Sequence, residues 1–115
     1  MRGVGLVGPA APWAGGIARF TSDLAAQLRT RGDVCWLSWR TPRRHPPPGT
    51  EVDLTATPDP LALPLLGLLD RGSWRAAGER LQACPVAILI PVDGGHMWMF
   101  GRWDRFRHEL VRAAA

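Results

Sequence analysis

The sequence predicts one three-layer α/β domain built on a short, mostly parallel β-sheet. Three observations lead to this prediction: an apolar strand begins the chain, a helix with one apolar face follows it, and a second apolar strand comes after a short turn. Short connections in such a strand–helix–strand unit favour a right-handed crossover between parallel strands. The 115 residues, 46% of them hydrophobic and 21% charged, correspond to a single globular domain.

The first strand–helix–strand unit occupies the first forty residues. We expect a strand over Gly3 to Gly8, ended by Pro9. A helix is expected from Ile17, where the apolar residues take on a helical period. Its apolar stripe consists of Ile17, Phe20, Leu24 and Leu28. The second strand is expected over Val34 to Trp39, which is rich in Trp, Val and Leu.

The middle of the chain is rich in proline. Residues 41–50 combine four prolines with two arginines and a histidine, which predicts an exposed loop. A short third strand is expected over Val52 to Leu54. The apolar run from Pro58 to Leu69 contains three prolines, which favours a broken helix or a packed loop.

A helix, a strand and a final helix are expected in the last part of the chain. Ser73 is expected to cap the first of these helices, which ends before Pro85. The run from Val86 to Ile90 indicates a strand buried on both faces. The final helix is expected over about residues 102–114. Its apolar side consists of Trp103, Phe106, Leu110 and Ala114.

The final helix and the tryptophan content each lead to one further expectation. Arg105 and Glu109 are spaced to pair on the polar side of the final helix. The six tryptophans are many for a stand-alone domain of this length. We therefore expect some of them to face a missing domain or an acceptor.

The basic charge comes from arginine alone. Fourteen arginines and no lysine stand against ten acidic residues, giving a net charge of +4. Asparagine and tyrosine are also missing, as a GC-rich coding sequence would give. Most arginines are scattered on polar helix faces, apart from a cluster of Arg40, Arg43, Arg44 and His45. A solvated basic surface is therefore expected, and nucleic acid is not expected as a partner.

No secretory leader or membrane span is expected. The residues after Arg2 are broken by glycine and proline, and the longest apolar run, Pro60 to Leu69, is about half the roughly 20 residues that a span needs. We expect a cytoplasmic chain with at most a peripheral contact at the inner face of the membrane. Cys35 and Cys84 lack metal-ligand spacing and are expected to be reduced, structural thiols, with no metal and no cofactor bound.

One glycine motif is misleading. Residues Gly3 to Gly8 match the pattern G-x-G-x-x-G, which in dinucleotide-binding proteins follows a strand and opens a helix. Here the pattern lies inside the expected strand, and the second strand ends in Trp39-Arg40 rather than in an acidic residue. The motif therefore does not indicate a dinucleotide site.

A second glycine pair, Gly15-Gly16, lies between the first strand and the first helix. Glycines at this point let the backbone approach a bound group, and the free N–H groups of the first helical turn point at it. A phosphate or a sugar hydroxyl would suit such a position. The alternative is a turn that the chain geometry alone requires.

The opening segments together resemble a known enzyme family. Val4 to Pro9, Pro12 to Phe20, Leu24 to Leu28 and Arg31-Gly32 before a second strand resemble the start of the family 4 glycosyltransferases. The resemblance covers residues 2–40 well and extends more loosely to about residue 90. Those enzymes have the GT-B fold of two Rossmann-like domains. The resemblance implies that this chain is an incomplete, Rossmann-like amino-terminal half of such a fold.

The resemblance also implies an activity and a site. Members transfer a sugar, usually with retention and without a tightly bound metal, from a nucleotide-diphosphate donor to an acceptor such as a glycan or a lipid-linked sugar. Gly15 and Gly16 would then approach the donor diphosphate and the transferred sugar. Trp13 and Arg19 would border the cleft as candidates for acceptor contact. His96 is the nearest equivalent of a catalytic-site histidine that many members carry near the transferred sugar.

The length limits what this chain is expected to do alone. In the family, the donor nucleotide is held mainly by the carboxyl-terminal domain, which this sequence does not contain. We therefore expect no appreciable transfer without a separate carboxyl-terminal half. The alternative class is a small non-enzymatic α/β interaction module or a vestigial gene fragment.

Overall fold

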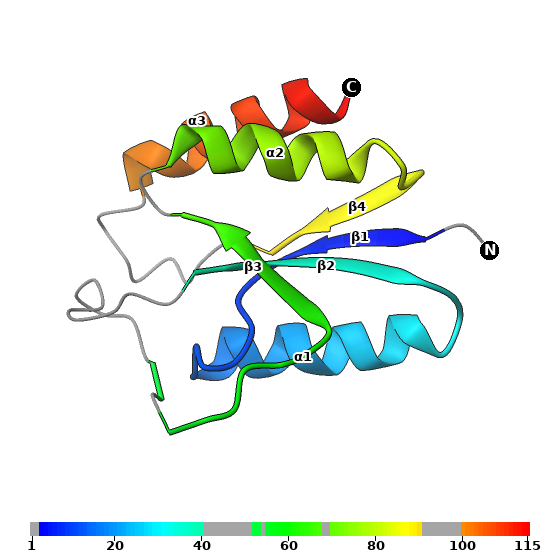
Figure 1. The fold of residues 1–115 in the computed structure, drawn as a ribbon, viewed down its shortest axis with the longest axis vertical. Helices are drawn as coiled ribbons and strands as arrows, with labels where there is room; N and C mark the ends of the chain where they lie inside the picture. Colours follow the sequence, from blue (N-terminus) through cyan, green and yellow to red (C-terminus); the bar gives the residue numbers. More distant parts are fainter. Residues whose placement is uncertain (1–2, 41–51, 54, 68–69, 91–99) are drawn as a thin grey trace.

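The described part of the chain is an all-parallel sheet covered by helices on both faces (Figure 1). The computed structural model describes residues 3–40, 52–53, 55–67, 70–90 and 100–115, with side chains described from residue 105 in the last range. The elements are β1 (Val4–Val7), α1 (Gly16–Arg29), β2 (Val34–Trp39), β3 (Ala62–Leu66), α2 (Arg71–Leu81), β4 (Val86–Leu89) and α3 (Phe100–Ala114). The strand order is β3-β2-β1-β4. Helix α1 covers one face, and α2 and α3 cover the other, which confirms the three-layer α/β prediction.

The strand–helix–strand unit at the start of the chain is confirmed. Strands β1 and β2 pair in parallel, with Val4 opposite Val34 and Val7 opposite Leu37. Helix α1 crosses between them and begins at Gly16, one residue earlier than expected. The two strands form the middle of the sheet, so their apolar side chains are buried from both faces.

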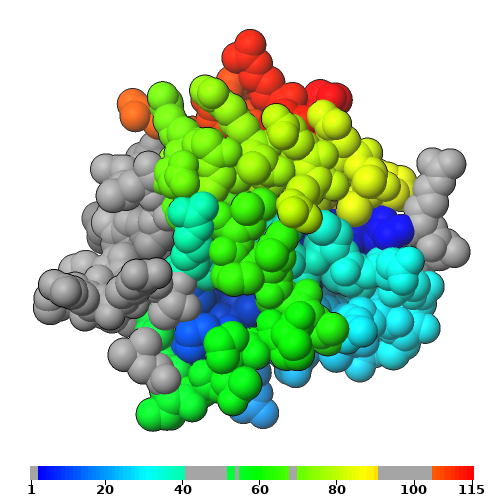
Figure 2. Space-filling model, in the orientation of Figure 1, coloured from blue at the N-terminus to red at the C-terminus, as the bar shows by residue number. Residues whose placement is uncertain are grey.

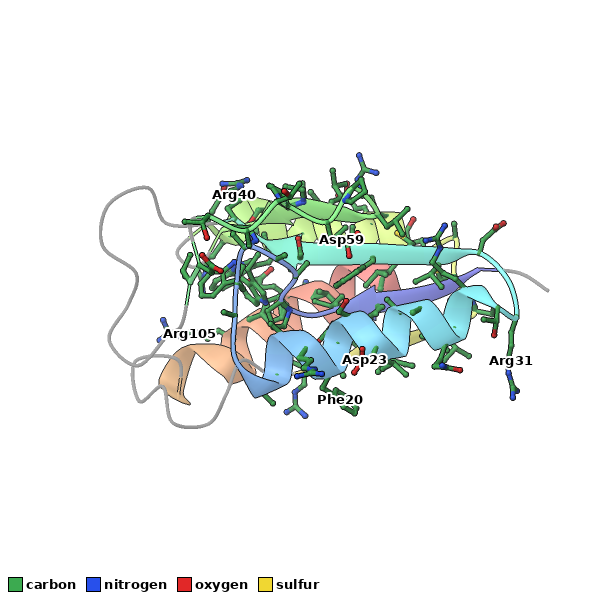
Figure 3. All side chains as sticks on the ribbon, turned by 90° about the horizontal axis from the view of Figure 1, so that it is seen from below. Phe20, Asp23, Arg31, Arg40, Asp59 and Arg105 are labelled. Carbon is green, nitrogen blue, oxygen red and sulfur yellow. The ribbon has the colours of Figure 1, made fainter. Side chains whose placement is uncertain are left out.

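The buried face of α1 differs from the predicted stripe. Phe20 is 55% exposed and points away from the sheet (Figure 3), while the fully buried residues of this helix are small: Ala18, Thr21 and Ala25. The reason is the close approach of α1 to the sheet. A Cβ added to Gly8 would lie only 2.8 Å from Cγ2 of Thr21. Large side chains cannot fit at this distance, so Ile17, Leu24 and Leu28 are half-buried at the sides of the contact.

The third strand lies where a broken helix or loop was expected. Residues Ala62–Leu66 form β3 at one edge of the sheet, parallel to β2, with Pro64 opposite Ser38. An edge strand needs ladder hydrogen bonds on one side only, and proline is therefore tolerated there. The strand expected over Val52 to Leu54 is not part of the sheet in its described residues: Val52 forms an isolated antiparallel bridge with Trp13. Figure 2 shows green residues of the segment that leads into β3 beside blue residues of the amino-terminal part of the chain.

Strand β4 is the other edge of the sheet, which corrects the expectation of a strand buried on both faces. It pairs with β1 alone, and Val86 is 58% exposed. Ile88 and Leu89 are half-buried. An apolar run of this kind suits a central strand equally well, and only the strand order decides between the two positions.

Four of the six tryptophans are core residues. Trp13, Trp36, Trp39 and Trp74 are all at most 7% exposed. The ring of Phe106 in α3 lies 4.9 Å from that of Trp39 and 5.7 Å from that of Trp74. These four therefore face neither a missing domain nor an acceptor, and the expectation that some tryptophans do so falls on Trp98 and Trp103. The side chains of Trp98 and Trp103 lie outside the described residues.

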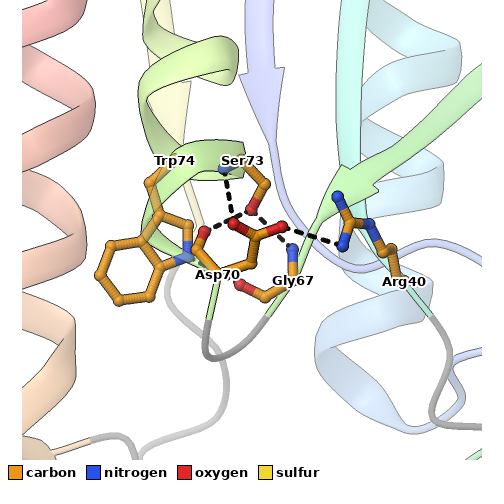
Figure 4. Close-up of polar contacts among 5 residues, drawn as sticks. All are labelled: Arg40, Gly67, Asp70, Ser73 and Trp74. Atoms are coloured by element: carbon orange, nitrogen blue, oxygen red, sulfur yellow. Dashed lines mark hydrogen bonds and ion pairs between the residues drawn. The ribbon is translucent and has the colours of Figure 1, made fainter.

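The residue that caps α2 is Asp70 and not Ser73 (Figure 4). The Asp70 carboxylate accepts the backbone N–H of Ser73 at 3.2 Å and pairs with the Arg40 guanidinium at 3.2 Å. Ser73 Oγ donates to the Asp70 carbonyl at 2.6 Å and accepts the Gly67 N–H at 2.9 Å, while the Trp74 indole N–H donates to the Gly67 carbonyl at 2.7 Å. The Ser73 N–H, and after it Arg40, hold the pKa of Asp70 below its usual value.

Helices α2 and α3 pack closely because α2 carries a glycine at their contact. A Cβ added to Gly78 would collide with the Leu110 carbonyl oxygen and lie 2.6 Å from Cβ of Ala113. An ion pair at 3.1 Å between Arg75 and Glu109 closes the exposed side of the contact. Glu109 therefore pairs with Arg75 of α2 and not with Arg105, its expected partner. The hydrogen bond from Arg75 lowers the pKa of the Glu109 carboxyl.

We expect Gly78→Ala to destabilise the domain. The added methyl meets backbone atoms of α3, so the helices must separate, at a cost of about 1–3 kcal/mol and a loss of about 5–15 °C in Tm. Gly16→Ala is the matched control, because a Cβ there meets nothing within 4 Å. Thermal unfolding followed by circular dichroism measures both. Equal Tm values for Gly78→Ala and the wild type would show that the helices are not in close contact.

We also expect the Tm of Asp70→Asn to depend less on pH in acid than the Tm of the wild type does. Asparagine still caps the helix but carries no charge. Because the folded pKa of Asp70 is lowered, the wild-type carboxylate stabilises the fold above its ordinary pKa and loses this effect as the pH falls through the folded value. The Tm of the wild type should therefore fall more steeply than that of the variant between about pH 5 and pH 3. Parallel curves would contradict the pairing, and Arg40→Gln should give a partial effect.

Candidate functional site

The candidate site lies where α1 begins, beyond the carboxyl end of β1. The strand order reverses at β1, because β2 lies on one side of it and β4 on the other. In open parallel sheets, ligands bind outside the carboxyl ends of the strands near such a reversal. The loop from Gly8 to Gly15 leads from this edge of the sheet into α1.

The loop before α1 is fixed by hydrogen bonds to distant segments. The Trp13 indole N–H donates to the Trp39 carbonyl at 2.9 Å, inside the core at the end of β2. The backbone N–H of Asp53 donates to the Pro12 carbonyl at 2.8 Å, next to the bridge between Trp13 and Val52. The β2–β3 connection thus holds the loop in place.

The crevice between the ends of β1 and β4 is filled by protein atoms in the described residues. A Cβ on Gly8 would lie 3.1 Å from Cβ of Ile90, and the Ile90 N–H donates to the Val7 carbonyl at 2.8 Å. The Trp36 indole N–H donates to the Gly8 carbonyl at 3.2 Å. Space for a ligand therefore begins further along the loop, at the helix terminus.

Gly15 is the residue that turns the chain into the helix. Its φ of 95° lies in the left-handed region, which side chains disfavour, so glycine is required here by the backbone. It occupies the capping position without a side chain to accept the first N–H groups. No acidic residue stands in the first turn either. The first-turn N–H groups and the positive end of the helix dipole are thus left for another acceptor.

Gly16 differs from Gly15 because the fold does not require it. Its φ lies outside the left-handed region, and an added Cβ would meet no atom within 4 Å. The residue is exposed. The chain thus keeps a glycine at a position where the protein itself leaves room for a side chain.

A surface hollow of about 500 Å³ lies over this helix start. It is lined by Ala11, Trp13, Ala14, Gly15, Gly16, Ala18, Arg19, Ser22 and Asp23. All four residues predicted to bind substrate, Trp13, Gly15, Gly16 and Arg19, line it together. Arg19 is exposed, whereas Trp13 is buried and its indole N–H is already bonded, so Trp13 holds the loop and offers the hollow no polar group.

Two polar residues of the hollow were not predicted from the sequence. Ser22 and Asp23 are exposed on α1, three and four positions after Arg19. Residues at this spacing share a helix face, so the position of Arg19 already indicated them. Figure 3 shows Asp23 on the same helix as the outward-facing Phe20. A guanidinium, a hydroxyl and a carboxylate beside free backbone N–H groups can together bind a phosphate and the hydroxyls of a sugar.

His96, the predicted catalytic-site histidine, lies outside the described residues, as does the whole arginine and proline loop at 41–50. Across the described ranges, no three His, Cys, Asp or Glu side chains are grouped so that they could hold a metal ion. Within those same ranges, none of the helices has the length and apolar character needed to cross a membrane.

No protein-family model matches the chain, and no curated protein or solved structure matches it either. The family resemblance therefore remains a prediction from the amino-terminal motifs. The fold, the open helix start and the polar hollow are the observations from which a function can be argued.

Proposed function

We propose that this chain is the amino-terminal, acceptor-side domain of a family 4-like glycosyltransferase. Together with a separate donor-binding half, it moves a sugar, with retention, from a nucleotide-diphosphate donor to a glycan or lipid-linked acceptor. We place this activity in the cytoplasm, with at most a peripheral contact at the inner face of the membrane. The parallel sheet, with a Gly-Gly helix start after β1, supports this assignment.

The observation that carries the proposal is the open space at Gly16. A glycine that the backbone does not require, at an uncapped helix start, is explained by a bound group that approaches the backbone. A diphosphate or a sugar hydroxyl accepts the N–H groups of the first turn and gains from the helix dipole. A turn required by chain geometry alone accounts for Gly15, whose φ is positive, but not for Gly16.

The side chains of the hollow can bind different parts of a ligand. Arg19 offers a positive charge to a phosphate or an acidic acceptor, and its fork of N–H groups can bind two oxygens at once. Ser22 and Asp23 offer partners to sugar hydroxyls further along α1. His96 stays the candidate for a group near the transferred sugar.

The hollow forms only one wall of a site. It is open to solvent on its outer side, since Gly15, Gly16, Arg19, Ser22 and Asp23 are all exposed. Sugar transfer needs water to be excluded and both substrates to be held in a reactive geometry. In the proposal, a second domain supplies the opposite wall, and the chain alone is inactive.

We expect Gly16→Leu to abolish ligand binding without unfolding the domain. The side chain starts in open space and extends into the hollow, where it covers the N–H groups of the first turn. Titration of the isotope-labelled wild-type chain with UDP-glucose, GDP-mannose or pyrophosphate should shift the amide NMR signals of Gly16, Ile17 and Ala18. The variant should lose these shifts. Transfer with a donor-binding half supplied should fall by about 100-fold or more.

Ala26→Leu is the matched control, because it adds a large side chain to an exposed position of the same helix away from the hollow. It should bind and react like the wild type. If none of the three ligands shifts the amides of the helix start, either in the chain alone or with the donor-binding half supplied, the proposal is wrong. A non-enzymatic interaction module, or a vestigial fragment, would then be the better description. Unchanged transfer by Gly16→Leu would remove the hollow from the site.

A further inference from the structure

The two cysteines of the chain lie at the amino end of the sheet, away from the hollow. Cys35 is the second residue of β2, and Cys84 lies in the turn between α2 and β4. Both are half-buried and neither forms a disulfide. The proposed glycosyltransferase site uses neither of them.

The sheet register and α2 bring the two cysteines to one face. Cys35 stands opposite Gly5 of β1, and its side chain packs against the core on the side of α2 and α3. Leu81, a member of the same core, lies over Gly5: its Cδ2 is 2.5 Å from where a Cβ on Gly5 would be. Cys84 follows as α2 ends, with its N–H donating to the Leu81 carbonyl at 2.9 Å. Cys35 and Cys84 therefore both lie at the amino end of the sheet, on the face that α2 covers.

The two thiols also interact electrostatically. Burial raises the pKa of the Cys35 thiol, and Cys84 raises it further, by the negative charge of its thiolate and by hydrogen bonding. Arg80, at the end of α2, acts in the opposite direction. An interaction of this kind weakens with distance, and it agrees with the placement of both thiols on one face of the sheet.

We propose that Cys35 and Cys84 form a redox-active dithiol that a disulfide of the glutathione class oxidises to an internal disulfide. The pairing joins β2 to the α2–β4 turn across β1. It goes beyond the sequence-based expectation of two structural thiols, and it does not depend on the proposed transferase activity.

Glutathione disulfide is the only oxidant that the formation of the Cys35–Cys84 bond requires. The thiolate of one cysteine attacks a sulfur of glutathione disulfide, forming a mixed disulfide and releasing one glutathione thiolate. The second cysteine loses its proton to solvent and attacks the cysteine sulfur of the mixed disulfide. The Cys35–Cys84 bond forms, and the second glutathione leaves as a thiolate. The protein loses two electrons and two protons, and glutathione disulfide takes up the two electrons.

The new bond closes a loop that contains β3 and α2. It therefore restricts the unfolded chain more than the folded one. It also fastens the turn that leads into the edge strand β4, which pairs with β1 alone. Oxidation should raise the Tm, and reduction with dithiothreitol should reverse the rise.

The test is equilibration of the full chain in buffers of varied reduced and oxidised glutathione, followed by alkylation of remaining thiols and mass spectrometry of the peptides. We expect a Cys35–Cys84 linked peptide in the native protein. The equilibrium constant for its formation should be at least about tenfold larger than in the same chain unfolded in urea. Cys35→Ser and Cys84→Ser should each carry one glutathione and no internal bond.

The proposal is overturned by either of two results. The native chain could accumulate only mixed disulfides with glutathione, which would mean that the sulfur atoms cannot reach each other. Alternatively, the linked peptide could form no more readily in the native chain than in urea, which would mean that the fold does not bring the thiols together. Both measurements use the wild-type chain, so a variant that fails to fold cannot obscure the answer.

Discussion

The close approach between backbone and side chains at three glycines is the constraint on which the rest of the structure depends. Gly8 lets Thr21 of α1 reach the sheet, Gly5 lies under Leu81 of α2, and Gly78 lets α3 lie against α2. Each helix is thus positioned by one missing side chain. The domain can bury its apolar surface in three thin layers only because these contacts are short, since a short chain has little core with which to compensate for gaps.

This constraint gives the G-x-G-x-x-G pattern a physical meaning. Two of its glycines serve helix packing: Gly5 is buried in β1, and Gly8 is buried directly after β1 ends. The glycines of the proposed site, Gly15 and Gly16, lie outside the pattern. An added Cβ meets protein atoms at Gly5 and Gly8 but open space at Gly16, a difference that the sequence alone does not reveal.

Local patterns predicted the elements well where local forces decide them. Strand β2 and the crossover helix α1 follow directly from apolar periodicity and helix stop signals. The errors occur where tertiary position decides. Pro64 argued against a strand, yet β3 is an edge strand, and the apolar run of β4 gave no sign that it lies at the other edge. Phe20 fitted the helical stripe, but the narrow gap at Gly8 admits only small residues.

The candidate site was also predicted only in part, because contacts between distant segments decide some of its features. Gly15, Gly16, Trp13 and Arg19 were found from the motif, and they line one hollow. That Trp13 is anchored by the Trp39 carbonyl could not be read from the sequence, because its partner is distant along the chain. Ser22 and Asp23 needed only the helical spacing from Arg19.

The way in which the loop before α1 is held has a consequence for how such a site can change. Val52 and Asp53 fasten the loop at Trp13 and Pro12, but neither of them lines the hollow. The shape of the hollow can therefore be retuned from outside, by substitutions or length changes in the β2–β3 connection that leave every lining residue in place. Connecting segments in general tolerate sequence change better than strands and helices do. If the hollow is the proposed site, its ligand preference can therefore diversify without any change to the lining residues.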